Sequence, residues 1–232
     1  MITSKAISPS SIIPRLENGD KLTRAEFERR YNAMPPNIQA ELIEGIVYMA
    51  SALRIRQHGQ PHAHVIVWLG YYEAFTNGLE LADNATVRLD GDNEPQPDAL
   101  LRINRHGNSI VSDDDYVEGV PELIAEVAAS SVSYDLHQKL NVYRRNGVQE
   151  YLVWRVNDSQ LDWFRLREGE YIGLQPDAEG VIRSEIFPGL WLDKNALLSG
   201  DMPKVLTILQ QGLASREHEI FLKKLSADNI ET

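Results

Sequence analysis

Apolar positions along the chain recur with two different spacings, one typical of helices and one typical of strands. Between residues 61 and 75, apolar and aromatic residues follow the helical period, which predicts a buried helix. A continuous apolar run at 123–127 indicates a strand buried on both faces. Helical spacing returns at 135–146 and is followed by Gly147, a candidate C-cap. Secondary structure of both types is therefore expected throughout the chain.

Shorter patterns predict the remaining elements. A helix capped by Thr23 and a strand pair turning at Glu44 and Gly45 precede the buried helix. A β-hairpin turns at Glu168 and Gly169. The other expected elements are strands at 81–89, 99–103 and 148–156, an acidic loop at 107–119, a meander strand at 180–187, and helices at 194–198, 203–212 and 215–225.

The order of these elements predicts one mixed α/β (α+β) domain. It begins with a loose leader at residues 1–20, continues as a single domain at 21–225 and ends in a polar tail at 226–232. The domain combines a mixed sheet and flanking helices with a C-terminal β meander and further helices. The 232 residues are enough for one medium-sized domain with its own core.

Composition narrows the class of protein. At 43% hydrophobic and 25% charged residues, the chain has the balance of a globular protein in water. It has no cysteine, which excludes disulfides, thiolate metal sites and cysteine nucleophiles, and which fits a reducing cytoplasm. No apolar run approaches the ~20 residues of a membrane helix. A cytoplasmic protein without a membrane partner is expected.

The net charge of −11 argues against a general nucleic-acid coat, because phosphate contacts require a basic surface. A nuclease stays compatible with this charge if basic residues line one cleft and the acidic excess lies elsewhere, for example at 113–115. The best basic candidates for phosphate contacts are Arg102, Arg105, Arg144 and Arg145.

Two acidic residues lie in strand-like segments. Asp98 follows Pro97, and Glu126 lies at the end of the apolar run. A carboxylate at the end of a buried strand needs a charged partner, a metal or water, because burial alone costs several kcal/mol. Each could simply cap a loop or meet an arginine. Together on adjacent strands they could hold a divalent cation, and Lys139 nearby could stabilise the charge that develops when a phosphodiester is attacked.

Lys139 follows Asp135 by four residues, so the two share a face of the expected helix. They could form a surface ion pair worth a few tenths of a kcal/mol. Alternatively, Lys139 lies at a metal site and Asp135 orients it, with Gln138 beside them. The spacing alone leaves both interpretations open.

Three histidines resemble a metal cluster at first sight. Gly59 and Pro61 separate His58 from the helix that carries His62 and His64, and the latter two point apart on a helix. A zinc site needs about four convergent ligands. We therefore expect His58 in a loop, His62 at a helix start, and neither close to His64.

At these residues the chain resembles a known family, the Uma-type restriction endonucleases of the PD-(D/E)XK nuclease superfamily. The likeness extends over residues 20–195. Five segments carry it: Glu41-Leu42-Ile43-Glu44-Gly45; His62 opening the aromatic helix; Pro97-Asp98; Glu126-Val127-Ala128-Ala129-Ser130; and Asp135 to Lys139 with Tyr143 and Gly147-Val148-Gln149-Glu150-Tyr151.

The resemblance implies a restriction-endonuclease-like core and a Mg²⁺-dependent deoxyribonuclease, in which Asp98 and Glu126 bind Mg²⁺ or Mn²⁺. The superfamily places a lysine two residues after the second acid, but this chain has Ala128 there. Lys139 on the next helix is the corresponding lysine in this family. Glu41 matches an early acidic position that could assist.

DNA would then be the substrate, and a homodimer would bring together two sites for two cuts. The alternative from another class is a non-catalytic interaction module that retains the nuclease fold. The net negative charge favours this alternative, and the presence of Asp98, Glu126 and Lys139 together disfavours it.

Overall fold

A computed structural model describes residues 13–50, 53–129 and 131–227. Its centre is a six-stranded mixed sheet in the order β11-β10-β9-β8-β5-β3. Only β8 and β9 run parallel, and the other neighbouring strands are antiparallel. The strands are β3 (Leu79–Asp83), β5 (Ala99–Ile103), β8 (Leu123–Ala128), β9 (Glu150–Arg155), β10 (Gln160–Arg167) and β11 (Glu170–Gly173).

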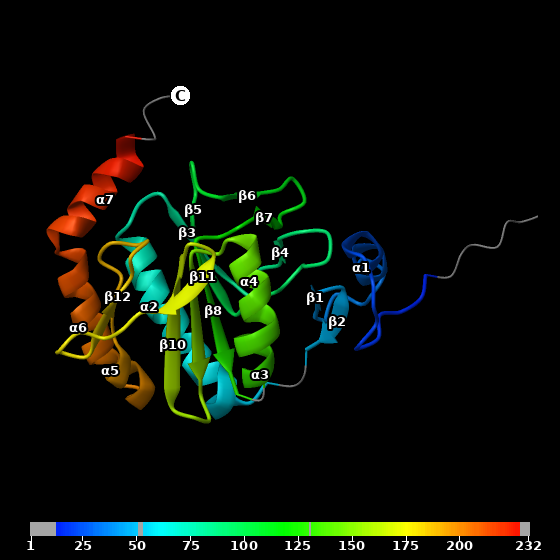
Figure 1. The fold of residues 1–232 in the computed structure, drawn as a ribbon, viewed down its shortest axis with the longest axis horizontal. Helices are drawn as coiled ribbons and strands as arrows, with labels where there is room; N and C mark the ends of the chain where they lie inside the picture. Colours follow the sequence, from blue (N-terminus) through cyan, green and yellow to red (C-terminus); the bar gives the residue numbers. More distant parts are fainter. Residues whose placement is uncertain (1–12, 51–52, 130, 228–232) are drawn as a thin grey trace, which may run out of the picture.

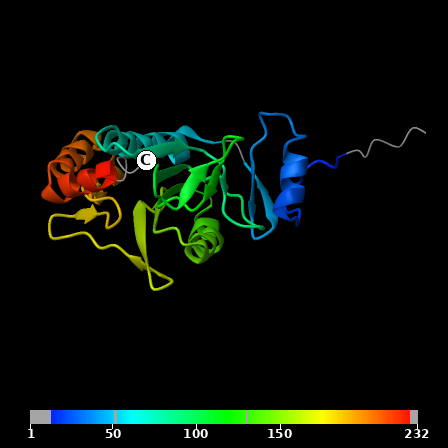
Figure 2. The same ribbon diagram turned by 90° about the horizontal axis from the view of Figure 1, so that it is seen from above.

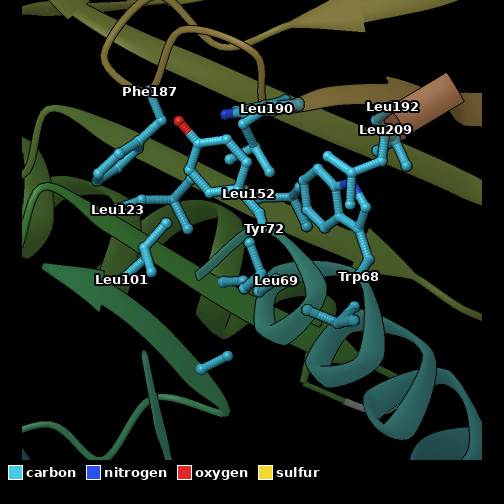
Figure 3. Close-up of a cluster of buried hydrophobic side chains, with 14 of the residues drawn as sticks. Trp68, Leu69, Tyr72, Leu101, Leu123, Leu152, Phe187, Leu190, Leu192 and Leu209 are labelled. Atoms are coloured by element: carbon cyan, nitrogen blue, oxygen red, sulfur yellow. The ribbon is translucent and has the colours of Figure 1, made fainter. Parts of the chain in front are cut away.

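Helix α2 (Gln60–Ala74) covers one face of this sheet. Trp68 and Tyr72 of the helix are fully buried against leucines of the strands and against Phe187, as Figure 3 shows. Trp68 meets Trp163 of β10 edge-to-face, with 5.5 Å between the ring centroids. The C-terminal helices extend this layer at the outer side of α2 (Figure 1), and they are α5 (Lys194–Ser199), α6 (Met202–Leu213) and α7 (Arg216–Ala227).

The opposite face carries the helical crossover that joins β8 to β9. It consists of α3 (Val132–Tyr134), a π-helical turn η2 (Asp135–Lys139) and α4 (Leu140–Asn146). Val142 and Tyr143 of α4 pack against Ile124 of β8 and Val153 of β9. Seen from above in Figure 2, α2 in cyan and α4 in green lie on opposite sides of the sheet.

Three smaller parts surround the central sheet. At the N-terminal side, α1 (Arg24–Tyr31) packs on the hairpin of β1 (Ala40–Ile43) and β2 (Ile46–Met49), with a separate core around Phe27 and Leu42 (Figure 1). The others are a three-stranded sheet of β4 (Val87–Arg88), β6 (Ser109–Val111) and β7 (Val117–Gly119), and a pair of β12 (Val181–Arg183) and β13 (Trp191–Asp193).

The predicted class, a mixed α/β fold with a sheet between helices, is confirmed. The expected acidic loop at 107–119 was wrong, because β6 and β7 form a hairpin there with the three aspartates at 113–115 in its turn. Strand β7 also pairs with β4, where Val87 lies opposite Val117. Local sequence does not reveal this partner because the two strands are far apart in the chain. Likewise, the single strand expected at 81–89 is divided between β3 and β4.

Two further expectations need correction. The segment at 180–187 does not continue the meander, because β12 pairs with β13 instead of with β11. Leu16 is buried in the small N-terminal core, so the loose leader does not extend to residue 20. Residues 1–12 of that leader and residues 228–232 of the tail lie outside the described residues. None of the helices in the described part is long and apolar enough to cross a membrane.

Candidate nuclease site

A cavity of about 640 Å³ opens beside the β1–β2 hairpin, where β5 begins and β8 ends. Its other walls come from η2 and from a second π-helical turn, η1 (Ile55–Gly59), which runs directly into α2. Four carboxylates and one lysine line the cavity, and they are Glu41, Asp98, Glu126, Asp135 and Lys139. Residues from five distant segments of the chain therefore meet here.

The strand register brings Asp98 and Glu126 to the same place. Ala99 of β5 is paired with Ala125 of β8 in the antiparallel ladder. Continuing this register by one step puts Asp98 opposite Glu126, and the alternation of side chains sends both toward the face of Leu100 and Ile124. The Val127 N–H donates a 2.6 Å hydrogen bond to Asp98 Oδ2, which fixes the carboxylate against β8.

Two histidines hold Asp98 from the α2 side. His58 Nε2 lies 2.9 Å from Asp98 Oδ1, and His62 Nε2 lies 2.8 Å from the Asp98 carbonyl oxygen and 3.1 Å from Asp83 Oδ1. Burial acts to raise the pKa of Asp98, but the contacts with His58, Val127 N–H and the Lys139 charge outweigh it and lower that pKa. The hydrogen bond to Asp98 in turn raises the pKa of His58.

The position of His58 corrects the expectation of a loop. Helical structure begins at Ile55, before Gly59, and η1 and α2 are continuous, so His58 and His62 lie one turn apart with ring centroids 5.2 Å from each other. Pro61 is tolerated because it occupies the first turn of α2, directly after the π-helical turn. As expected, His62 opens α2, and His64 points elsewhere, toward Gly200.

The ligand atoms of His58, His62 and Asp98 lie within 4.8 Å of one another, which is compact enough for a metal ion. Their hydrogen bonds favour another role. His62 Nε2 is already engaged by two oxygens, and His58 Nδ1 is buried without a hydrogen-bond partner in the described structure. A metal-ligating histidine normally donates its other ring N–H to an acceptor. The pair therefore positions Asp98.

Lys139 lies at the centre of the charged groups. Its Nζ is 2.9 Å from Glu126 Oε1 and 3.0 Å from Glu41 Oε2, and both Lys139 and Glu126 are only 4% exposed. Of the two interpretations left open by the spacing, the surface ion pair with Asp135 is not formed, and Lys139 makes buried pairs with residues of two other elements. Burial opposes the charge on Lys139, but the surrounding carboxylates outweigh it and raise its pKa.

Glu126 receives a second hydrogen bond that sequence reasoning missed. Tyr143, one helical turn after Lys139, donates its hydroxyl hydrogen to Glu126 Oε1 over 3.0 Å. Burial raises the pKa of Glu126 well above its usual range, and Asp98, Asp135 and Glu41 add to this rise against the opposing charge of Lys139. The i, i+4 spacing of Lys139 and Tyr143 was the available signal for this contact.

The supporting residues have different positions. Glu41 Oε2 also accepts a hydrogen bond from the Gln96 N–H at 3.1 Å, which holds the hairpin against the segment before Asp98. Burial raises the pKa of Asp135 to about 6. Gln138 is not among the residues that line the cavity, and its side chain accepts a 2.9 Å hydrogen bond from Tyr48 at the surface. It connects the hairpin to η2.

The nuclease interpretation expected the acidic excess to lie away from the site. The structure instead places part of it inside the cavity. Four carboxylates share the cavity with one lysine, one exposed arginine and His58. Burial is the main cause of the raised pKa of both Glu126 and Asp135, and the neighbouring carboxylates add to the rise against the charge of Lys139. Carboxylate oxygens are the ligands that Mg²⁺ prefers, so these residues fit a divalent cation.

Three of the basic residues expected to contact phosphate are committed elsewhere. Arg102 is buried and bonds Glu80 and Ser109, Arg144 pairs with Glu170, and Arg145 pairs with Glu44. Arg105 follows the far end of β5, away from Asp98. The arginine that lines the cavity is Arg54, immediately before η1.

The model of the Uma2 family, described as "Putative restriction endonuclease", matches residues 24–195. The chain belongs to this family. The match covers all five lining acidic and lysine residues and ends within α5, before α6 and α7.

A solved structure supports the same fold. A protein of Anabaena variabilis ATCC 29413, described as a putative nuclease belonging to DUF820, superposes with a TM-score of 0.56 over 73% of this chain and 97% of its own, at 14% identity. No curated protein matches the sequence. The expected nuclease family and nuclease-like fold are therefore confirmed.

Proposed function

We propose that this member of the Uma2 family is a Mg²⁺-dependent endonuclease that hydrolyses DNA phosphodiester bonds, with Mn²⁺ as a possible substitute. The supporting observation is the cavity in which Asp98, Glu126, Glu41 and Asp135 surround Lys139. Asp98 and Glu126 would hold the metal, and Lys139 would stabilise the charge that develops on the attacked phosphate. A homodimer that presents two sites is part of the same proposal.

The contacts of each residue fit its proposed role. His58, His62 and the Val127 N–H fix Asp98 in place, and Tyr143 fixes Glu126, so the two metal ligands need little reorganisation. When bound, the cation polarises the phosphate and activates a water. Lys139 is held between Glu126 and Glu41, from which its ammonium can face the same cavity.

Nicking of supercoiled plasmid in Mg²⁺ or Mn²⁺ tests the activity, and calorimetric titration of the metal tests the site. Asp98→Asn removes one ligand charge at constant shape and should abolish both nicking and metal binding. Glu170→Gln is the matched control, because it removes one exposed carboxylate from β11, and it should change neither.

The two readouts separate the alternatives. A wild-type protein that binds no Mg²⁺ and nicks no DNA contradicts the proposal and supports the non-catalytic interaction module. If the wild type nicks DNA and Asp98→Asn nicks it equally well, the activity is supported but the assignment of Asp98 as a metal ligand is contradicted.

A further inference from the structure

A second, smaller cavity of about 210 Å³ is lined by other residues of the same η1–α2 segment that borders the charged cavity. Its lining includes Arg56, Gln60 and His64, together with Ser159 of the β9–β10 turn and Ser199 at the end of α5. These side chains offer hydrogen-bond donors, and none of the lining residues is acidic. The cavity therefore has the chemistry of an anion site.

The two cavities share a wall. Arg54 and His58 of the η1 region line the first cavity, and Arg56 between them in sequence lines the second. The β9–β10 turn contributes in the same way, with Asn157 in the first cavity and Ser159 in the second. An extended strand that leaves the charged cavity across η1 would therefore reach the second cavity directly.

Arg54 and Arg56 differ from most arginines of the described chain in having no ion pair. Arg88 and Arg155, for comparison, each pair with at least two acids. Two acids of the β9–β10 region, Asp158 and Asp162, are both held by Arg155. The charges of Arg54 and Arg56 are thus available to a ligand.

The η1 turn has two other features of a contact surface. It is π-helical, a geometry that is rare and occurs frequently at functional sites. Large apolar side chains at its start and just before it face solvent, with Leu53 at 65% and Ile55 at 76% exposure, the highest values among the large apolar residues described. The sequence Leu53-Arg54-Ile55-Arg56 thus presents cations and apolar groups beside the catalytic cavity.

We propose that the second cavity binds a backbone phosphate of the nucleic-acid strand whose scissile phosphate lies at Asp98 and Glu126. Arg56 and His64 are the donors to that phosphate, and Arg54 contacts the strand where it crosses η1. This inference rests on the proposed function. It gives a chain of net charge −11 a way to engage a polyanion, because two arginines without an ion pair line the charged cavity and the smaller cavity next to it.

Binding of a fluorescein-labelled single-stranded oligonucleotide, followed by anisotropy in EDTA so that no metal-dependent cleavage occurs, tests this subsite. Arg56→Gln should weaken binding about fivefold, regardless of sequence, and should reduce the slope of log K against log salt by about 0.7, the value for one phosphate contact on a single strand. Arg216→Gln, which removes an unpaired arginine from α7, should change neither quantity.

Steady-state cleavage in Mg²⁺ supplies the second readout. Arg56→Gln should raise KM and leave kcat nearly unchanged, because a remote phosphate contact contributes equally to substrate and transition state. Arg56 is exposed, so its replacement should leave the melting temperature unchanged, and this is measured in parallel.

The subsite would be overturned if Arg56→Gln binds the oligonucleotide and cleaves with the same affinity and KM as the wild type, or if Arg216→Gln loses as much affinity as Arg56→Gln. In either case, plasmid nicking by the wild type would still support the nuclease. Absence of both oligonucleotide binding and nicking in the wild type would overturn the subsite and the proposed function together.

Discussion

Glu126 is a buried carboxylate whose negative charge depends on two neighbours, the ammonium of Lys139 and the hydroxyl of Tyr143. Taking ions out of water costs several kcal/mol each, and a buried pair is retained only where geometry and further hydrogen bonds compensate. Lys139 therefore has a structural task in the metal-free protein as well as the proposed one toward phosphate.

Replacing Lys139 with methionine keeps most of the bulk and removes the charge. Because Glu126 and Glu41 would then face each other without a cation, we expect a loss of about 3 kcal/mol in the free energy of unfolding without metal, measured by urea denaturation. In saturating Mg²⁺ the loss should be smaller, since the metal replaces the missing positive charge. Nicking in Mg²⁺ should be abolished.

Lys223→Met is the control for this change. Lys223 forms an exposed i, i+4 pair with Glu219 on α7, and its removal should cost only a few tenths of a kcal/mol. A Lys139→Met protein as stable as the wild type without metal would show that the buried ion pairs contribute nothing.

Glu94 is a second buried acid, outside the charged cavity. Burial and the neighbouring carboxyl of Glu28 raise its pKa to about 8. The folded protein then retains a proton that the unfolded chain releases above about pH 4.5, so this contribution to stability is complete at low pH and is lost as the pH rises through 8.

Glu94→Gln keeps the side chain neutral at every pH. Relative to the wild type, we expect the variant to gain stability between pH 5 and pH 9, by about 2 kcal/mol after allowance for solvent screening. Urea denaturation at the two pH values measures the change. Glu179→Gln, an exposed acid in the turn before β12, should show no such pH-dependent gain. A constant difference for Glu94→Gln would contradict the raised pKa.

At the scale of elements, β9 is fixed at its start by Glu150, which lies at the end of the strand away from the site. Glu150 Oε1 accepts hydrogen bonds from the Glu185 and Ile186 N–H groups, and Oε2 accepts from Ser184 and Trp163. The carboxylate therefore joins β9 and β10 to the segment after β12. This contact accounts structurally for one residue of the segment that resembles the family.

Both carboxylate oxygens of Glu150 accept hydrogen bonds. In Glu150→Gln an NH₂ group replaces one of these oxygens, so the buried donors on that side lose their acceptor. We expect the free energy of unfolding to fall by about 2 kcal/mol, measured by urea denaturation, with the Mg²⁺ affinity unchanged. An equal loss of metal affinity would instead show that the two ends of β9 are coupled. Glu170→Gln on the neighbouring β11 serves as the exposed control.

At the scale of the whole molecule, α6 and α7 lie beyond the residues that match the family model, yet they are part of the main core. Gly212 of α6 packs directly on Gly189, and a Cβ at position 212 would meet the Gly189 carbonyl oxygen and lie 2.8 Å from Trp191 Cγ. Trp191 in turn accepts, through its carbonyl, the indole hydrogen bond of Trp68 in α2.

Gly212→Ala should therefore destabilise the protein by about 2 kcal/mol, because backbone and ring must move to admit the methyl group. We expect one cooperative transition that circular dichroism and tryptophan fluorescence report at the same midpoint. Gly91→Ala, where a Cβ meets nothing within 4 Å, is the matched control. Two separate transitions would show that α6 and α7 unfold independently of α2 and the site it supports.

Local sequence determined most elements and the residues that carry the likeness to nucleases. The period of apolar residues located α2, α4, β8 and β9, since burial of one helix face or both strand faces requires that pattern. The same local view misplaced what depends on remote partners. The β6–β7 hairpin required β4 beside it, and β12 paired with a strand that follows it instead of with the meander.

The charged cavity shows the same division. Asp98, Glu126, Lys139, Glu41 and Asp135 were identified from sequence, but helical spacing left open whether Lys139 pairs with Asp135, because spacing describes only contacts within one helix. Tertiary packing decided this question, because the hairpin and β8 place two other carboxylates at the ammonium. It also decided that His58 and His62 hold Asp98, and that Arg54 and Arg56 line the two cavities. The physical reason is that strand register and packing determine which distant groups come within hydrogen-bond distance of one another.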